Sequence, residues 1–245
     1  MKVAVPMKLS IIVPFFNEAK NIILVIKRLR ELMADAAYAI EVIIVDGCST
    51  DDTPQVLREE FENLDPNQFK YILMEKRGGY GHDIMCGVSI ATGEVLSSTH
   101  ADMQTDPVDV LKVYEIYVAN ADSKCIIKGK RKNRRLSETF YTFGMQIATW
   151  CILKKYLDDI NAQPKLFSRK FYEKYMRIGA PDDFSLDLFC LYTAKYNGCK
   201  ILEIPVVFAD RIHGEAKGGG GSWKNRYRLI RRTFKYILKL RANFL

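Results

Sequence analysis

The sequence predicts an α/β protein built on a mostly parallel, doubly wound sheet. In the first half of the chain, short apolar runs alternate with amphipathic runs, which is the pattern of successive βαβ units. Polar or glycine-containing residues follow the first four predicted strands, at the edge where such sheets bind ligands. At 245 residues, with 48% hydrophobic and 27% charged residues, one domain of this kind is expected.

The elements of the first half follow from two periodicities. The apolar run 9–15 predicts a strand, and a helix is expected at 18–32 because Ile22, Val25 and Leu29 share one helical face. The same signals predict strands at 41–45, 69–74, 95–99 and 125–128, and helices at 51–61, 82–91 and 107–119.

Two of these helices have recognisable start signals. Ser49 or Thr50 is expected near the N-cap of the helix at 51–61. Asp106 suits the N-cap of the helix at 107–119, with Pro107 at the first position of that helix.

The second half is less regular but still alternates. It predicts a long amphipathic helix at 137–157, a short strand at 164–167, a helix at 184–196 and a strand at 200–208. The run 218–222 has the composition of a flexible linker. Because structured sequence flanks it on both sides, we interpret it as a mobile active-site loop.

The net charge of +8 comes from the C-terminal segment. Residues 222–245 hold eight of the 37 Lys and Arg residues and no acid, so the other 29 basic residues balance the 29 acidic ones. This distribution argues against a nucleic-acid-binding surface across the whole domain. Apolar residues recur in this segment at spacings of 4, 3, 4 and 3: Trp223, Tyr227, Ile230, Phe234 and Ile237.

That spacing predicts a basic amphipathic helix at 222–245, with two interpretations. The helix can lie on an anionic bilayer, or it can dock on the domain with its basic face in water. The chain has no apolar run long enough to span a membrane. Its six cysteines are scattered without a C-x-x-C pair, which favours reduced thiols in a cytosolic protein over disulfides or a zinc site.

Asp102 and Gln104 form a candidate metal site at the end of the strand at 95–99. Residues two apart in a strand face the same way, and carboxylate and amide oxygens are hard donors that suit Mg²⁺ or Mn²⁺. Mg²⁺ commonly takes one or two carboxylates and completes its shell with water and phosphate. The alternative, a strand end followed by a capped helix, explains Asp106 but not Asp102 and Gln104.

Seven segments in order resemble the family-2 glycosyltransferases, and among them the dolichol- or polyprenol-phosphate sugar synthases. The resemblance spans about residues 8–217. The matching segments are residues 13–18, 45–53, 91–94, 101–104, 129–131, 184–188 and 211–217. It implies a Rossmann-like GT-A fold and an inverting transfer from a nucleoside-diphosphate sugar. Residues 1–221 would then form the nucleotide-sugar-binding catalytic domain.

The resemblance also assigns roles to residues. Pro14, Asn17 and Glu18 would line the nucleotide pocket, and Asp46 would contact the base. An alternative for Asp46 is that it only caps the turn before the next helix.

Further roles concern the diphosphate. Asp102 and Gln104 would hold the divalent cation there. Three cations would face phosphates: Arg131, Arg211 and Lys217. Guanidinium groups suit phosphate oxygens, and a metal with added cations stabilises a departing diphosphate. Alternatively, these basic residues are ordinary surface charges.

Three features depart from the family pattern. His100 stands where the first acid of the Asp-x-Asp motif is usual, and neutral imidazole can ligate a metal but brings no charge. The turn 78–83 lacks the pattern of a phosphate-binding P-loop. The segment 159–164 differs from the glycine-containing acceptor motif.

The acceptor decides whether a catalytic base is needed. A polyprenyl phosphate is already ionised at pH 7 and needs positioning, whereas a sugar hydroxyl needs a carboxylate to accept its proton. Asp187 is the candidate base in the resembling segment, beside Asp182 and Asp183, which helix capping explains better.

The sequence thus predicts a metal-dependent inverting glycosyltransferase, cytoplasmic and peripheral on the cytosolic face of a membrane, that acts on a polyprenyl phosphate. One alternative is an enzyme that adds a sugar to a hydroxyl of a surface glycan or glycolipid. Another is a non-enzymatic module that binds nucleotide sugars, or nucleic acid through the basic segment.

Overall fold

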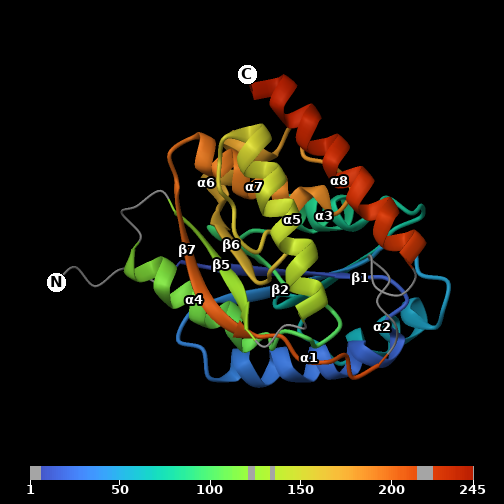
Figure 1. Ribbon diagram of the computed structural model, residues 1–245. Helices are drawn as coiled ribbons and strands as arrows, with labels where there is room; N and C mark the ends of the chain where they lie inside the picture. The colour runs from blue at the N-terminus through green and yellow to red at the C-terminus, as the bar shows by residue number, and fades with distance from the viewer. Residues whose placement is uncertain (1–6, 121–124, 133–135, 214–222, 245) are drawn as a thin grey trace.

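The computed structural model describes residues 7–120, 125–132, 136–213 and 223–244, and it shows a single seven-stranded sheet in the order β3-β2-β1-β4-β6-β5-β7 (Figure 1). All strand pairs are parallel except those of β6, which runs antiparallel to β4 and β5. The strands are β1 (Leu9–Phe15), β2 (Ile40–Asp46), β3 (Phe69–Leu73), β4 (Val95–Ser98), β5 (Cys125–Lys132), β6 (Lys165–Ser168) and β7 (Lys200–Val207).

Helices cover both faces of the sheet (Figure 1). Those of the first half are α1 (Ala19–Ala34), α2 (Thr53–Phe61), α3 (Tyr80–Ile90) and α4 (Val108–Ala119). Those of the second half are α5 (Leu136–Leu153), α6 (Arg169–Phe171), a π-helix (Tyr172–Met176), α7 (Ser185–Tyr196) and α8 (Trp223–Phe244).

Alternation along the strands produces two hydrophobic cores, one on each face. Ile11 and Val13 of β1 belong to the core that also contains residues of α1 and α4, whereas Ile12 belongs to the core with residues of α3, α7 and α8. Strands that are buried on both faces have nearly continuous apolar sequences. The observed bounds of β1 therefore coincide with the apolar run at residues 9–15. The predicted α/β class and mostly parallel sheet are confirmed.

The structure corrects several local predictions. The predicted caps of α2 are wrong: the N-cap residue is Asp52, which makes no side-chain cap hydrogen bond, and Ser49 and Thr50 contact Asn17 instead. Strand β5 extends to Lys132 instead of ending at residue 128, because it pairs with β7 along its whole length. The turn of α6 and the π-helix, directly after β6, were not predicted.

The predicted C-terminal amphipathic helix is confirmed as α8, and it packs on α5 and α7. Ile237 and Leu240 are 1% exposed and belong to the core. Tyr227, Ile230 and Phe234 of the predicted apolar stripe are exposed instead. The helix therefore docks on the domain and also presents apolar side chains to solvent. Among the described residues, no helix is long and apolar enough to cross a membrane.

Candidate functional site

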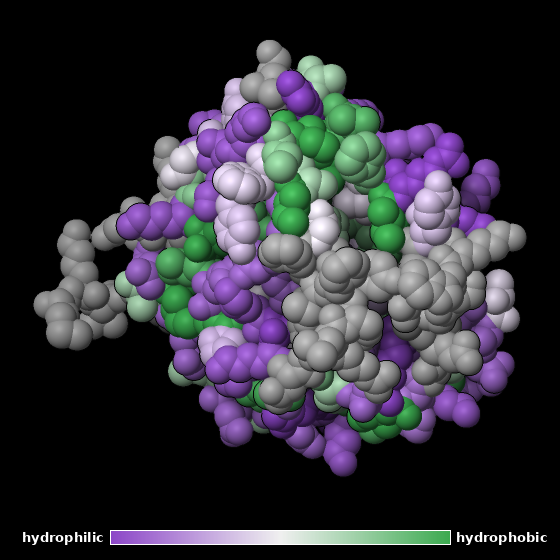
Figure 2. Space-filling model, viewed as in Figure 1, coloured by the Kyte–Doolittle hydropathy of each residue, from purple (hydrophilic) through white to green (hydrophobic). Residues whose placement is uncertain are grey.

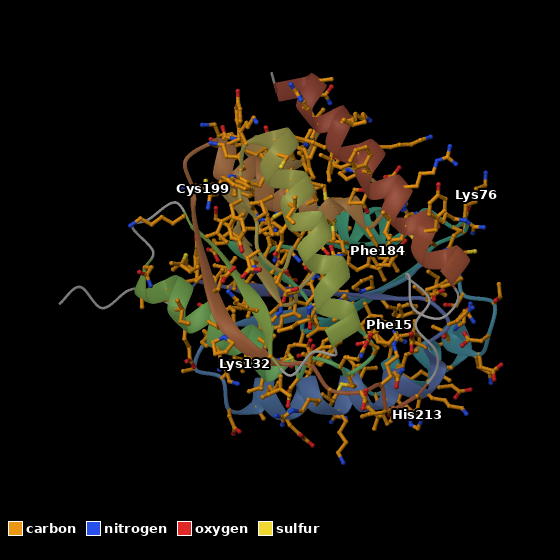
Figure 3. All side chains as sticks on the ribbon, in the orientation of Figure 1. Phe15, Lys76, Lys132, Phe184, Cys199 and His213 are labelled. Carbon is orange, nitrogen blue, oxygen red and sulfur yellow. The ribbon has the colours of Figure 1, made fainter. Side chains whose placement is uncertain are left out.

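A cavity of about 340 Å³ opens at the carboxyl ends of β1, β4 and β5. In Figure 3, the lining residues Phe15 and Phe184 are labelled close together beside α8, while Cys199 lies at the far end of the sheet. The cavity collects seven residues that the sequence analysis assigned to the site: Pro14, Glu18, Asp102, Gln104, Arg131, Asp187 and Arg211.

Arg211 joins two carboxylates that are far apart in sequence. Its Nη1 lies 3.0 Å from Glu18 Oε1, and its Nη2 lies 2.8 Å from Asp102 Oδ2. Glu18 follows β1, Asp102 follows β4, and these strands are neighbours in the sheet. Arg211 is not an ordinary surface charge, because its side chain is only 19% exposed and contacts both carboxylates.

Asp102 and Gln104 line the same cavity, but not for the predicted reason. Strand β4 ends at Ser98, so the alternation of strand side chains does not extend to them. They lie in a bend with Met103 at φ 57°, in which Asp102 Oδ1 accepts the Gln104 N–H at 3.1 Å. The Gln104 side chain donates to the carbonyl oxygen of Ala209 at 3.0 Å, which ties this bend to the chain after β7.

The donor set suits a hard divalent cation. The carboxylates of Glu18 and Asp102 are held around the single guanidinium group of Arg211, so these three groups together keep one net negative charge. Oxygen donors of this kind match Mg²⁺ and Mn²⁺. No cluster of three His, Cys, Asp or Glu side chains that could hold a metal occurs in the described part of the chain. A cation here therefore needs further ligands from a diphosphate or water.

Arg131 is fixed by a partner that the sequence did not indicate. Its Nε donates to Asp159 Oδ1 at 3.0 Å, and its guanidinium carbon lies 5.1 Å from the ring centroid of Phe208. The alternative of a solvated charge is wrong, because the side chain is 13% exposed. Asp159 begins the segment 159–164, which departs from the family pattern. That departure was the only sign in the sequence that Asp159 belongs to the site.

Asp187 and Tyr80 line the cavity and belong to a buried polar cluster. Asp187 Oδ1 lies 2.9 Å from Lys165 Nζ and accepts from Gln163 Nε2 at 3.2 Å. Gln163 also donates to the Tyr80 hydroxyl at 2.8 Å. Burial lowers the pKa of His100, which favours its neutral imidazole form. The predicted base candidate thus already has a buried cationic partner.

Other predicted residues lie outside this lining. Asp46 is buried and accepts a hydrogen bond from the Ser49 N–H at 3.1 Å. This contact matches the alternative in which Asp46 caps the turn before α2. Asn17 accepts from the Thr50 N–H at 2.7 Å. Asp183 accepts the Ser185 N–H at 2.7 Å, as expected for a residue that caps α7.

Lys217 lies outside the described residues, so its predicted position stays a prediction. Conversely, Arg77 and Asp83 line the cavity and were not assigned to the site. The glycine-containing turn at residues 78–83 was the feature of the sequence that could have indicated them, but it was tested only against the pattern of a phosphate-binding P-loop.

Comparison with known proteins identifies the family of the chain. The model of "Glycosyl transferase family 2" matches residues 10–180. The undecaprenyl-phosphate 4-deoxy-4-formamido-L-arabinose transferase of Proteus mirabilis is 22% identical over 86% of this chain and 62% of its own length. The dodecaprenyl-phosphate galacturonate synthase of Rhizobium johnstonii is 25% identical over 96% of this chain and 65% of its own length. The chain therefore spans less than two thirds of these relatives.

Solved structures share the fold. Glucosyl-3-phosphoglycerate synthase from Mycobacterium tuberculosis, in complex with Mn²⁺, UDP and glucosyl-3-phosphoglycerate, superposes with a TM-score of 0.70 at 15% identity, over 97% of this chain and 80% of that one. A mannosyltransferase from Pyrobaculum calidifontis, in complex with GDP-Man and Mn²⁺, superposes with a TM-score of 0.60 at 18% identity, over 98% of this chain and 74% of that one. The fold is therefore GT-A-like, and since the family model covers most of the chain, the protein belongs to glycosyl transferase family 2.

Proposed function

We propose that this protein is a metal-dependent inverting glycosyltransferase that moves a sugar from a nucleoside diphosphate to a polyprenyl phosphate at the cytosolic face of a membrane. The observation that carries the proposal is the Glu18–Arg211–Asp102 cluster in the cavity. Two carboxylates suit a divalent cation, and Arg211 together with Arg131 suits phosphate oxygens. Bound Mg²⁺ or Mn²⁺ would neutralise the leaving diphosphate.

The polar groups around Asp187 favour a phosphate acceptor over a hydroxyl. Asp187 lies 2.9 Å from Lys165, and both side chains are almost fully buried. A carboxylate engaged in such a pair is poorly placed to take a proton from a sugar hydroxyl. An ionised phosphate needs no base, and the names of the distant relatives include polyprenyl phosphates.

Helix α8 supports a membrane-bound acceptor. Leu229 of this helix lines the cavity, so the helix lies at the site. Figure 2 shows hydrophobic side chains gathered over the region where α5 and α8 lie side by side. The exposed apolar residues of these helices are Ile147, Trp150, Tyr227, Ile230, Phe234 and Leu238. Exposed basic residues of α8 accompany this stripe, as in helices that lie on anionic bilayers.

The acceptor can be tested directly. Purified protein with Mn²⁺, a panel of nucleoside-diphosphate sugars and a short polyprenyl phosphate should yield a lipid-linked monosaccharide, detected by mass spectrometry. The same polyprenol without its phosphate should give no product, because the nucleophile is the phosphate oxygen. Product on a glycan hydroxyl, with none on the lipid phosphate, would support the second candidate and make Asp187 the base to test.

Reversing the charge of Arg228, Arg231 and Lys235 to Glu should remove binding to anionic vesicles. Each basic residue near such a surface contributes about 1 kcal/mol, so the loss should exceed about a hundredfold in affinity. Arg232 is left unchanged because it lies 2.9 Å from Asp183 and helps to dock α8. Vesicle co-sedimentation at several salt concentrations measures the effect.

The matched control reverses three exposed cations of α1, Lys20, Lys27 and Arg30, on the other face of the sheet. It changes the net charge equally but should leave most of the vesicle binding. If both triple variants lose binding to the same extent, net charge and not α8 governs membrane contact.

A further inference from the structure

Arg211 lies between two carboxylates of the cavity, where the proposed function needs a divalent cation. Its Nη1 atom lies 3.0 Å from Glu18 Oε1, and its Nη2 atom lies 2.8 Å from Asp102 Oδ2. The proposed function also assigns Arg211 to the phosphate oxygens of the donor. The N–H groups that bind the two carboxylates cannot bind a diphosphate at the same time, so these roles require Arg211 to change partners.

Charge makes Arg211 and a divalent cation alternatives at this position. Glu18 is 8% exposed and Asp102 is 7% exposed, so water screens the charges around them poorly. A divalent cation on the same two carboxylate oxygens would face the guanidinium group at close range, where like charges repel strongly. Both carboxylates can therefore hold the cation only when Arg211 leaves.

The two carboxylates do not depend on Arg211 for their orientation, because each has a neutral donor on its other oxygen. Asp102 Oδ1 accepts the Gln104 N–H at 3.1 Å. Glu18 Oε2 accepts from Asn21 Nδ2, in the first turn of α1, at 2.5 Å. The carboxylates thus form a site that Arg211 fills but does not build.

The backbone is anchored on both sides of Arg211. Ala209 donates its N–H to the carbonyl oxygen of Gln104 at 2.8 Å, and its own carbonyl oxygen accepts from Gln104 Nε2 at 3.0 Å. On the other side, Asn21 Nδ2 lies 3.4 Å from the carbonyl oxygen of His213, which is labelled beside α1 in Figure 3. A change of partner is therefore expected in the long Arg211 side chain and not in the backbone that carries it.

We infer that Arg211 and the divalent cation exchange places. Arg211 holds the two carboxylates together until the donor arrives with its metal, and its side chain then turns to the diphosphate. Two carboxylates with one guanidinium group keep one net negative charge, whereas two carboxylates with one divalent cation are neutral. This inference rests on the proposed function, because it describes the regulation of the same site.

The exchange predicts that metal and donor bind cooperatively. When the metal binds alone, Arg211 loses its carboxylate partners and gains no phosphate. When a nucleoside diphosphate binds with the metal, Arg211 gains phosphate oxygens as new partners. Both ligands thus favour the same new position of the Arg211 side chain, which couples their binding free energies.

Calorimetric titration of the full chain with Mn²⁺, alone and with saturating GDP or UDP, tests the exchange. Arg211→Gln removes the competing charge, so the affinity for Mn²⁺ alone should rise about 10- to 100-fold. In the same variant, the affinity for the nucleotide in the presence of Mn²⁺ should fall about tenfold, because a phosphate contact is lost. A residue that only stabilised the site would lower both affinities when replaced.

Arg77→Gln is the matched control, because Arg77 lines the same cavity and its side chain is 44% exposed. Arg77 Nη1 donates to the carbonyl oxygen of Gly47 at 2.9 Å, and its guanidinium carbon lies 3.4 Å from the ring centroid of Phe16. The control removes one positive charge from the cavity but not from the two carboxylates. Its affinity for Mn²⁺ alone should stay within about threefold of that of the unmodified protein.

The outcomes separate this inference from the proposed function. Unchanged or weaker binding of Mn²⁺ alone to Arg211→Gln would overturn the exchange, and so would an equal rise in both variants, while the glycosyltransferase proposal would stand. If neither GDP nor UDP binds to the unmodified protein with Mn²⁺, the proposed function itself fails. Should Arg211→Gln not fold, the unmodified protein still decides, because equal affinity for Mn²⁺ with and without nucleotide contradicts the exchange.

Discussion

Asp102→Asn should lower the turnover number by about a thousandfold while the protein stays folded. Asp102 is 7% exposed, and its carboxylate faces Arg211 in the cavity. Its charge is the one that a divalent cation would need most, because Gln104 brings only a neutral donor. The substitution keeps the shape of the side chain, so the loss should appear in kcat rather than in the thermal midpoint.

The matched control is Asp106→Asn, four residues later on the same loop. Asp106 binds Arg28 at 3.0 Å, and its side chain is 45% exposed and absent from the cavity lining. This variant should retain nearly full activity. Full turnover of the unmodified protein in excess EDTA, or an active Asp102→Asn variant, would contradict the metal role.

The sequence allowed β1 and β2 to be placed because strands that are buried on both faces are apolar along most of their length. The same reasoning failed just beyond β4, where no pairing continues and a bend, not alternation, brings Asp102 and Gln104 together. The short α6 and the π-helix carry too few residues for a periodic signal.

Partnerships across the sheet were beyond sequence reasoning. Arg211 and Glu18 are 193 residues apart, and Arg131 meets Asp159 across 28 residues. Single motifs indicated which side chains belong to the site, but only the strand order decides which of them face each other. Lys165 shows this limit best, since nothing in its local sequence predicts that a lysine in a strand is buried.

Lys165→Met should lower the free energy of unfolding by about 3–5 kcal/mol. Lys165 is 2% exposed, lies 2.9 Å from Asp187 Oδ1 and donates to the carbonyl oxygen of Ala162 at 2.8 Å. Removing it leaves the buried Asp187 carboxylate without its cation. Urea denaturation, followed by fluorescence, measures the change.

Lys128→Met is the matched control, because Lys128 is paired with Lys165 in the register of β5 and β6 and is equally buried. Its partner Glu203 is 28% exposed and also lies 3.3 Å from Lys130, so the carboxylate left behind keeps contact with water and with another cation. The control should therefore lose clearly less stability than Lys165→Met.

A double variant decides what the buried pair is for. Lys165→Met with Asp187→Leu replaces the pair by apolar side chains, which often restores most of the stability lost in the single variant. If the double variant folds and still glycosylates a polyprenyl phosphate, Asp187 is not the base of that reaction, and the pair serves to shape the cavity. If it folds with native stability but turns over no donor on either type of acceptor, Asp187 acts in the chemistry, and the argument from its partner Lys165 is wrong.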